Sequence, residues 1–224
     1  MKAEELLAPP VGSGGNSGEL EFTELVAVRH GLTDANAAGV LQGQFESNLV
    51  EAGIRQAERL AGRLARESFA AIYASDLSRA LATARIVAAA NGAPVIPDPV
   101  WREWHLGCLE NVSYGEAGER YPELIDAFRY DADDILIPDG ESKRAFYDRI
   151  GAALEAVAAR HVRQRVLIVT HGGVLQAMLK HVLGGGNTWK FLPRAANTGY
   201  NKFVRRDRGW QLCCWNDTSH LVDS

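Results

Sequence analysis

The sequence predicts an α/β fold, with a mostly parallel sheet and helices on both of its faces. Two observations lead to this prediction. Short apolar runs of strand length alternate with amphipathic segments of helical spacing, and a histidine followed by a glycine lies just past two of these runs. Strands that are joined by helices pair in parallel. With 224 residues and 46% hydrophobic content, the chain is long enough for one sizeable core.

The first half of the chain is predicted to start with a tail. Residues 1–20 contain a proline pair and a glycine- and serine-rich run, which cannot bury enough apolar surface to offset the ordering entropy. We therefore expect a disordered tail, followed by a single domain over residues 21–224. The expected elements are, in order, a strand at 24–28, a helix at 54–64, a strand at 70–74, a helix ending near Ala90 at an Asn91-Gly92 cap, and a strand at 95–96.

The second half begins with an irregular part. Residues 98–140 hold tryptophans, tyrosines and acidic residues without a clear period, and we interpret them as a segment that sets specificity. Regular elements return after it, because apolar residues again follow helical or strand spacing. They are a helix from Ser142, a buried strand at 166–170, a helix with apolar positions between Val174 and Val182, and a hairpin of 201–205 with 211–215.

Composition excludes several classes of protein. The net charge is −4, and no clustered basic patch indicates nucleic-acid binding. The apolar runs are far shorter than the roughly 18 residues of a membrane span, and the N-terminus lacks the apolar core of a signal peptide. The odd number of cysteines, Cys108, Cys213 and Cys214, argues against a disulfide framework. We therefore expect a cytoplasmic protein without membrane or nucleic-acid partners.

Two histidines are the first candidates for chemistry. His30 follows the first strand within Arg29-His30-Gly31, and His171 follows the 166–170 strand and precedes Gly172. Ligands of open α/β sheets bind beyond the carboxyl ends of the strands, so both histidines are expected at one crevice. A neutral imidazole is a competent nucleophile near pH 7. Together with the adjacent arginine, this pattern favours phosphoryl transfer at His30.

Other residues supply the remaining groups that phosphoryl transfer needs. Arg79 lies at a strand-to-helix junction, where a phosphate is favoured by the helix N-terminus and by a bidentate guanidinium. Glu103, between two tryptophans, is the best general acid. Thr33 and Asn36 provide neutral donors just after His30, and His105 is close enough to Glu103 to line the mouth of the site.

Five motifs in this order resemble one known family. They are Arg29-His30-Gly31, Ser75 to Thr83, Arg102-Glu103 with Gly107, Gly140-Glu141-Ser142, and Val169-Thr170-His171-Gly172-Gly173. Together they resemble the histidine phosphatase superfamily, also called the phosphoglycerate mutase-like family, over about residues 22–200. The resemblance implies a three-layer α/β/α sandwich with a mostly parallel central sheet.

The resemblance also implies a two-step mechanism. His30 would attack phosphorus to form a phosphohistidine, and Glu103 would first protonate the leaving alcohol and then activate water. Catalysis would use His30, Glu103 and His171, with Arg29, Arg79 and Asn36 on the phosphate. Thr33, Gln42, Gly43, His105 and Gly172 would contact the substrate. The family uses no metal and no other cofactor, acts on small phosphorylated metabolites, and is often homodimeric.

Within the family, a hydrolase is favoured over a mutase. Position 32 is leucine, where mutases often have glutamate, and the segment between Gly115 and Asp139 is short and lacks the adjacent Arg-Arg pair with which mutases hold a substrate carboxylate. A phosphoglycerate mutase remains the first alternative. The second is a non-catalytic module that binds phosphate esters, although the complete set of catalytic residue types argues against it.

Overall fold

The computed structural model describes residues 20–129, 135–184 and 193–222, and these residues build one six-stranded sheet flanked by helices. The strand order is β4-β3-β6-β1-β7-β8. The first four of these pair in parallel, β7 pairs antiparallel with β1, and β8 pairs antiparallel with β7. The predicted mostly parallel sheet is confirmed. The strands are β1 (Thr23–Arg29), β3 (Ala71–Ala74), β4 (Val95–Pro97), β6 (Arg165–Thr170), β7 (Tyr200–Arg206) and β8 (Gly209–Asp217).

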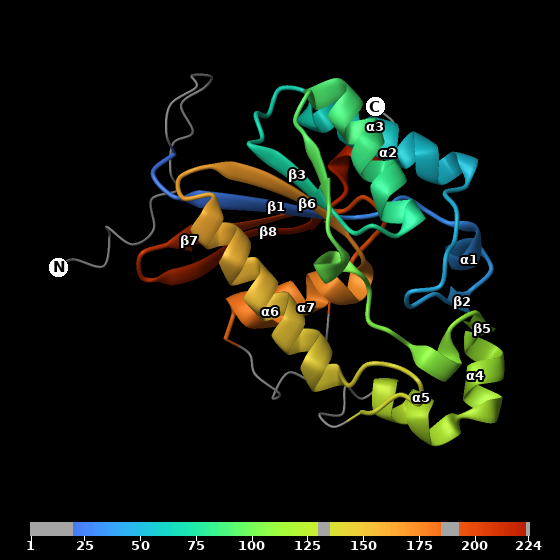
Figure 1. The fold of residues 1–224 in the computed structure, drawn as a ribbon. Helices are drawn as coiled ribbons and strands as arrows, with labels where there is room; N and C mark the ends of the chain where they lie inside the picture. The colour runs from blue at the N-terminus through green and yellow to red at the C-terminus, as the bar shows by residue number, and fades with distance from the viewer. Residues whose placement is uncertain (1–19, 130–134, 185–192, 223–224) are drawn as a thin grey trace.

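Helices cover both faces of the sheet, as Figure 1 shows. On one face lie α2 (Glu51–Leu64) and α3 (Ser78–Asn91), and on the other lie α6 (Lys143–Arg160) and α7 (Gly172–Val182). Successive strand residues point to opposite faces, so Leu25 packs in the α6–α7 layer and Val26 in the α2–α3 layer. The three-layer sandwich is therefore confirmed.

Local sequence signals fix several of the element ends. Gly92 ends α3 in the left-handed conformation (φ +80°), and its N–H donates to the carbonyl of Ala88. The Ser142 hydroxyl begins α6 by accepting a hydrogen bond from the Ala145 N–H at 3.2 Å. Both agree with the expected boundaries, and the expected hairpin is β7 with β8.

The segment predicted to be irregular contains short elements. They are two 3₁₀ turns, η2 (Pro99–Trp101) and η3 (Gly107–Leu109), the strand β5 (Val112–Ser113), and the helices α4 (Tyr114–Arg120) and α5 (Pro122–Arg129). Strand β5 pairs with β2 (Val40–Leu41), which follows the short helix α1 (Asp34–Ala37). A capping box of Ser113 and Glu116 starts α4, and this Ser-x-x-Glu pattern was a usable sequence signal.

Two parts of the sequence prediction lie outside the described residues. These are the tail, apart from Leu20, and residues 130–134 of the specificity segment. Near the end of the described chain, η5 (Ser219–Leu221) packs against α2. Across the described ranges, no helix is both long and apolar enough to cross a membrane.

Candidate active site

The pairing of β1 with β6 places the two histidines together. Arg29 lies opposite Thr170 in the parallel register, so the residues that follow, His30 and His171, leave the sheet side by side. The backbone N–H of His30 donates to the carbonyl of Thr170 at 2.9 Å. The two ring centroids are 5.2 Å apart, with 60° between the ring planes. The expected crevice at the carboxyl ends of the strands thus holds both imidazoles.

His30 presents one nitrogen that is free to react. Its Nδ1 is 2.7 Å from the carbonyl oxygen of Gly31, which can only accept, so Nδ1 carries the proton and Nε2 carries the lone pair. The side chain is buried. Burial, followed by the charges of Arg29 and Arg79, lowers the pKa of His30 well below its usual range. The imidazole is therefore neutral at neutral pH.

Arg29 and Arg79 place two guanidinium groups beside His30. Arg29 donates from Nη1 to the carbonyl of Ala195, and Arg79 donates to the carbonyls of Gly43 and Phe45 at 2.6 and 2.8 Å. The Nε atom of each arginine is buried and makes no hydrogen bond within the described residues. Burial lowers the pKa of Arg79 to about 10, so both groups stay cationic at neutral pH. Buried donors of this kind normally have a partner, and a bound anion would supply it.

His171 is fully buried at the start of α7. Neither of its ring nitrogens has a hydrogen-bond partner among the described residues. Burial, and then the charge of Arg79, lowers its pKa well below the usual range. Because it is the N-cap residue of α7, it lies at the positive end of the helix dipole, which favours an anion nearby.

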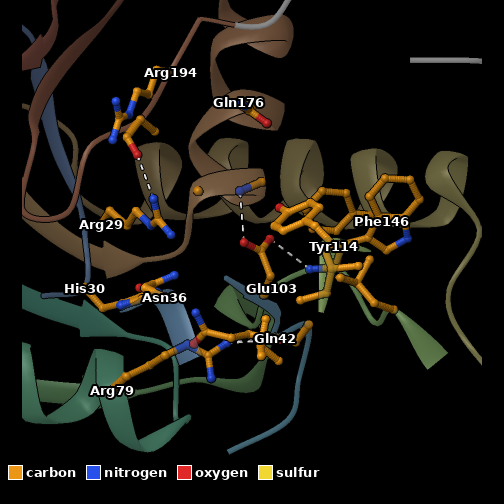
Figure 2. A pocket seen from close by; sticks show the side chains of 18 of the residues that line it. Arg29, His30, Asn36, Gln42, Arg79, Glu103, Tyr114, Phe146, Gln176 and Arg194 are labelled. Carbon is orange, nitrogen blue, oxygen red and sulfur yellow. Dashed lines mark hydrogen bonds between the residues drawn. The ribbon is translucent and has the colours of Figure 1, made fainter. Parts of the chain in front are cut away.

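The carboxylate of Glu103 is held by two backbone N–H groups. Its Oε2 accepts from Gly173 and its Oε1 accepts from Trp104, each at 3.0 Å, and Figure 2 shows it across the cavity from His30. A Cβ atom on residue 173 would lie 2.4 Å from the Glu103 Oε1. Glycine at this position is therefore what allows the carboxylate to approach the helix N-terminus.

These groups line one cavity of about 560 Å³. Most of the predicted site residues lie on its wall, and Figure 2 shows many of them from close by. The predicted residues on the wall are Arg29, His30, Asn36, Gln42, Gly43, Arg79, Glu103 and Gly172. His171 is buried against His30. The structure thus brings together the set that was assigned to the phosphate and to the two catalytic steps.

Thr33 and His105 were predicted to contact substrate but do not line this cavity. Thr33 is fully buried as the N-cap of α1. Its hydroxyl accepts from the Asn36 N–H and lies 3.2 Å from Oε1 of Gln42, so it holds two wall residues in place. The ring of His105 is partly exposed, with Nε2 at 3.7 Å from the Glu110 carboxylate. Their described contacts are structural.

Sequence reasoning missed several residues of the wall, among them Tyr114, Phe146, Gln176 and Arg194. Tyr114 is the first residue of α4, a helix that the capping pattern of Ser113 would have revealed. Gln176 lies one helical turn beyond Gly172 on α7. Arg194 lies between α7 and β7, where no sequence pattern distinguishes it.

A comparison with models of protein families identifies the family to which this chain is related. The model of the histidine phosphatase superfamily, branch 1, matches residues 25–218. The chain belongs to the histidine phosphatase superfamily. The resemblance read from the five motifs is confirmed, and the match extends beyond them into β7 and β8.

Similar proteins of this superfamily cover nearly the whole chain. A metal-independent phosphoserine phosphatase from Arabidopsis thaliana is 42% identical over 206 residues, which are 91% of this chain and 85% of the relative. Phosphoglycerate mutase-like protein 4 of the same plant is 37% identical over 213 residues, 93% and 91% of the two chains. The structure of YhfR from Bacillus stearothermophilus matches with a TM-score of 0.82 and 31% identity, over 89% of this chain and all of that one.

Proposed function

We propose that this protein is a metal-independent phosphatase that hydrolyses a small phosphomonoester through a phosphohistidine. One observation carries the proposal. A neutral imidazole, with its Nε2 free, lies in the same cavity as two guanidinium groups and a carboxylate. This arrangement supplies a nucleophile, charge for the phosphoryl oxygens and a group that can move a proton.

In the first step, Nε2 of His30 attacks phosphorus and a P–N bond forms. The bond from phosphorus to the ester oxygen breaks, and Glu103 gives its proton to that oxygen, so a neutral alcohol leaves. Arg29 and Arg79 hold the phosphoryl oxygens, as their unsatisfied Nε–H groups support. His171 and Asn36 complete the shell around the phosphoryl group.

In the second step, the Glu103 carboxylate takes a proton from water, and the water oxygen attacks the phosphohistidine. The P–N bond breaks and His30 regains its neutral form, with its Nδ1–H still donating to the carbonyl of Gly31. Inorganic phosphate leaves the site. The same carboxyl group therefore serves as acid and then as base.

The substrate is proposed to be a small phosphorylated metabolite. Phosphoserine is the first candidate, because the 42% identical relative carries that substrate in its name. The mutase-like name of a second relative keeps transfer back to the product as the competing outcome. Such a transfer would isomerise 3-phosphoglycerate instead of releasing phosphate.

The test is an incubation of the purified protein, in the presence of EDTA, with phosphoserine, other phosphomonoesters and 3-phosphoglycerate. Phosphate release and isomerisation are measured in the same samples. Release of phosphate from at least one ester in EDTA is the expected result. Isomerisation without release would replace the proposal with a mutase, and tight vanadate binding without any turnover would replace it with a binding module.

The proposal also includes a cytoplasmic location and a homodimer. Cys108, Cys213 and Cys214 are all free thiols, which supports a reducing compartment. The dimer is supported by the family resemblance alone. Cell fractionation tests the location, and light scattering after gel filtration tests the oligomeric state.

A further inference from the structure

Glu103 lies on a stretch of chain that has no helix or strand to hold it. Residues 102–106 connect the turns η2 and η3 without regular structure. Backbone carbonyls in such a stretch lack the partners that a helix or a sheet would supply. The position of the Glu103 carboxylate therefore depends on the side chains that bind this stretch, together with the N–H groups of Gly173 and Trp104 that bind the carboxylate itself.

Arg149, on the second turn of α6, supplies several of these contacts, and Gln44 adds one by donating from Nε2 to the carbonyl of Glu103 at 3.2 Å. Its Nη1 donates to the carbonyls of Val100 and Arg102 at 2.7 and 3.1 Å, and its Nη2 donates to the carbonyl of Glu103 at 3.5 Å. Its Nε and Nη2 also donate to the two carboxylate oxygens of Glu141 at 3.0 and 2.8 Å. These bonds use all five N–H donors of the guanidinium group.

Glu141 holds the other side of the same stretch. Its backbone carbonyl accepts from Nε1 of Trp104 at 2.7 Å, and its N–H donates to the carbonyl of His105 at 3.0 Å. The indole of Trp104 also stacks on Phe146, with 5.6 Å between the ring centroids and 7° between the planes. Arg149 and Glu141 together thus form hydrogen bonds with the chain both before and after Glu103.

This pair is shielded from water and is held rigidly. Its side chains are only 22% and 19% exposed, and the two parallel N–H···O bonds fix the orientation of the guanidinium plane. Lysine could keep the charge near Glu141, but it donates from a single atom and cannot reach the same set of carbonyls. The arrangement is therefore specific to arginine.

We propose that Arg149, held by Glu141, is a positioning residue that aims the Glu103 carboxyl group at the leaving oxygen. This inference rests on the proposed function, because it assumes that Glu103 is the general acid. It also gives a role to the Gly140-Glu141-Ser142 motif, which the two chemical steps do not use. Neither Arg149 nor Glu141 lines the cavity.

The loss of rate in a variant without Arg149 should depend on the leaving group of the ester. A displacement of about 1 Å at a proton donor can cost roughly a hundredfold in rate. The cost falls on esters whose leaving oxygen needs a proton, because a stable phenolate leaves without one. Phenyl phosphate and p-nitrophenyl phosphate share the same ring, and only the second has a stable leaving group.

The experiment measures kcat and KM of both esters for Arg149→Met, Glu103→Gln and the double variant. For Arg149→Met, we expect kcat/KM, which reports the step in which the alcohol leaves, to fall about tenfold with phenyl phosphate and less than about threefold with p-nitrophenyl phosphate. The inhibition constant of inorganic phosphate should stay unchanged, because the phosphate-binding groups are untouched. Arg144→Met, an exposed arginine of the same helix, is the matched control and should leave all values unchanged.

The double variant separates positioning from a general structural role. In the Glu103→Gln background, Arg149→Met should lower kcat/KM no further, because the carboxyl group that Arg149 positions has already been removed. An added loss of kcat/KM there, or an equal fall of kcat/KM for both esters with Arg149→Met alone, would overturn the inference. If Glu103→Gln itself lowers kcat/KM equally for both esters, the acid role and the proposed function fail instead.

A second variant keeps the test valid if Arg149→Met does not fold, which its melting curve would reveal. Arg149→Lys keeps a cation beside Glu141 but loses most of the carbonyl contacts. It should show the same selective slowing of phenyl phosphate, by a smaller factor. Wild-type rates with both esters for a folded Arg149→Lys protein would count against the inference.

Discussion

His30 and His171 leave neighbouring parallel strands at the same level, which brings their ring centroids to 5.2 Å. Both imidazoles are buried, and both have pKa values well below the usual range. They are separated by about 140 residues in the sequence. The register of β1 with β6, in which Arg29 lies opposite Thr170, brings them together. This pairing sets the centre of the candidate site.

Replacement of His30 by alanine tests the nucleophile. We expect His30→Ala to lower phosphate release roughly 10⁴-fold or more, the scale seen when a nucleophile is removed. A phosphoenzyme formed from a ³²P-labelled ester should disappear as well, and quenched labelling measures this directly. His181→Ala, at the far end of α7, is the control and should retain activity. Turnover by the His30 variant would remove this residue from the mechanism.

The buried histidines should make stability depend on pH. Because their pKa values are lowered in the folded state, the unfolded chain binds more protons below about pH 6.5. Their stabilising effect is therefore present above that pH and is lost as the pH falls. Each histidine contributes a slope of about 1.4 kcal/mol per pH unit.

Urea unfolding of the wild type and of His171→Asn, between pH 7.5 and 5.5, measures this slope. The variant should lose stability less steeply as the pH falls, because one of the two buried groups has been removed. Parallel curves for the two proteins would show that His171 takes up its proton as readily in the folded state as in the unfolded one.

Arg79 should determine the affinity for phosphate. A guanidinium that is already anchored to the carbonyls of Gly43 and Phe45 presents its unpaired Nε–H in a fixed direction, and lysine cannot reproduce this. We expect Arg79→Lys to raise the inhibition constant of inorganic phosphate about 10- to 100-fold, the value of one charged hydrogen bond. Arg85→Lys, at an exposed position of the same helix, should not change it. An unchanged constant for Arg79→Lys would place the phosphate elsewhere.

Gly173 should be intolerant of a side chain because of Glu103. The added Cβ would lie 2.4 Å from the carboxylate oxygen, so Glu103 must move. Gly173→Ala should lower kcat/KM about tenfold or more for phenyl phosphate, and less for p-nitrophenyl phosphate. Gly62→Ala, where nothing lies within 4 Å of the new methyl group, is the control for a helical glycine. An equal loss of kcat/KM for both esters would mean that this contact does not matter for the proton transfer.

The sequence alone determined the layered fold and most of the candidate phosphate-binding set. Periodicity located the long strands and helices, because an apolar face must be buried whatever lies around it. Arg29, His30, Arg79 and His171 were found because each one lies at a strand end or a helix start, and these positions meet at one edge of a parallel sheet.

The tertiary structure alone decided which residues surround that set. Phe146, Gln176 and Arg194 reach the cavity from separate parts of the chain, and Thr33 turned out to support the wall instead of forming it. The contacts of Arg149 with carbonyls nearly fifty residues earlier leave no local pattern. Short-range propensity fixes where an element begins and ends, whereas such long-range contacts exist only after the layers have packed.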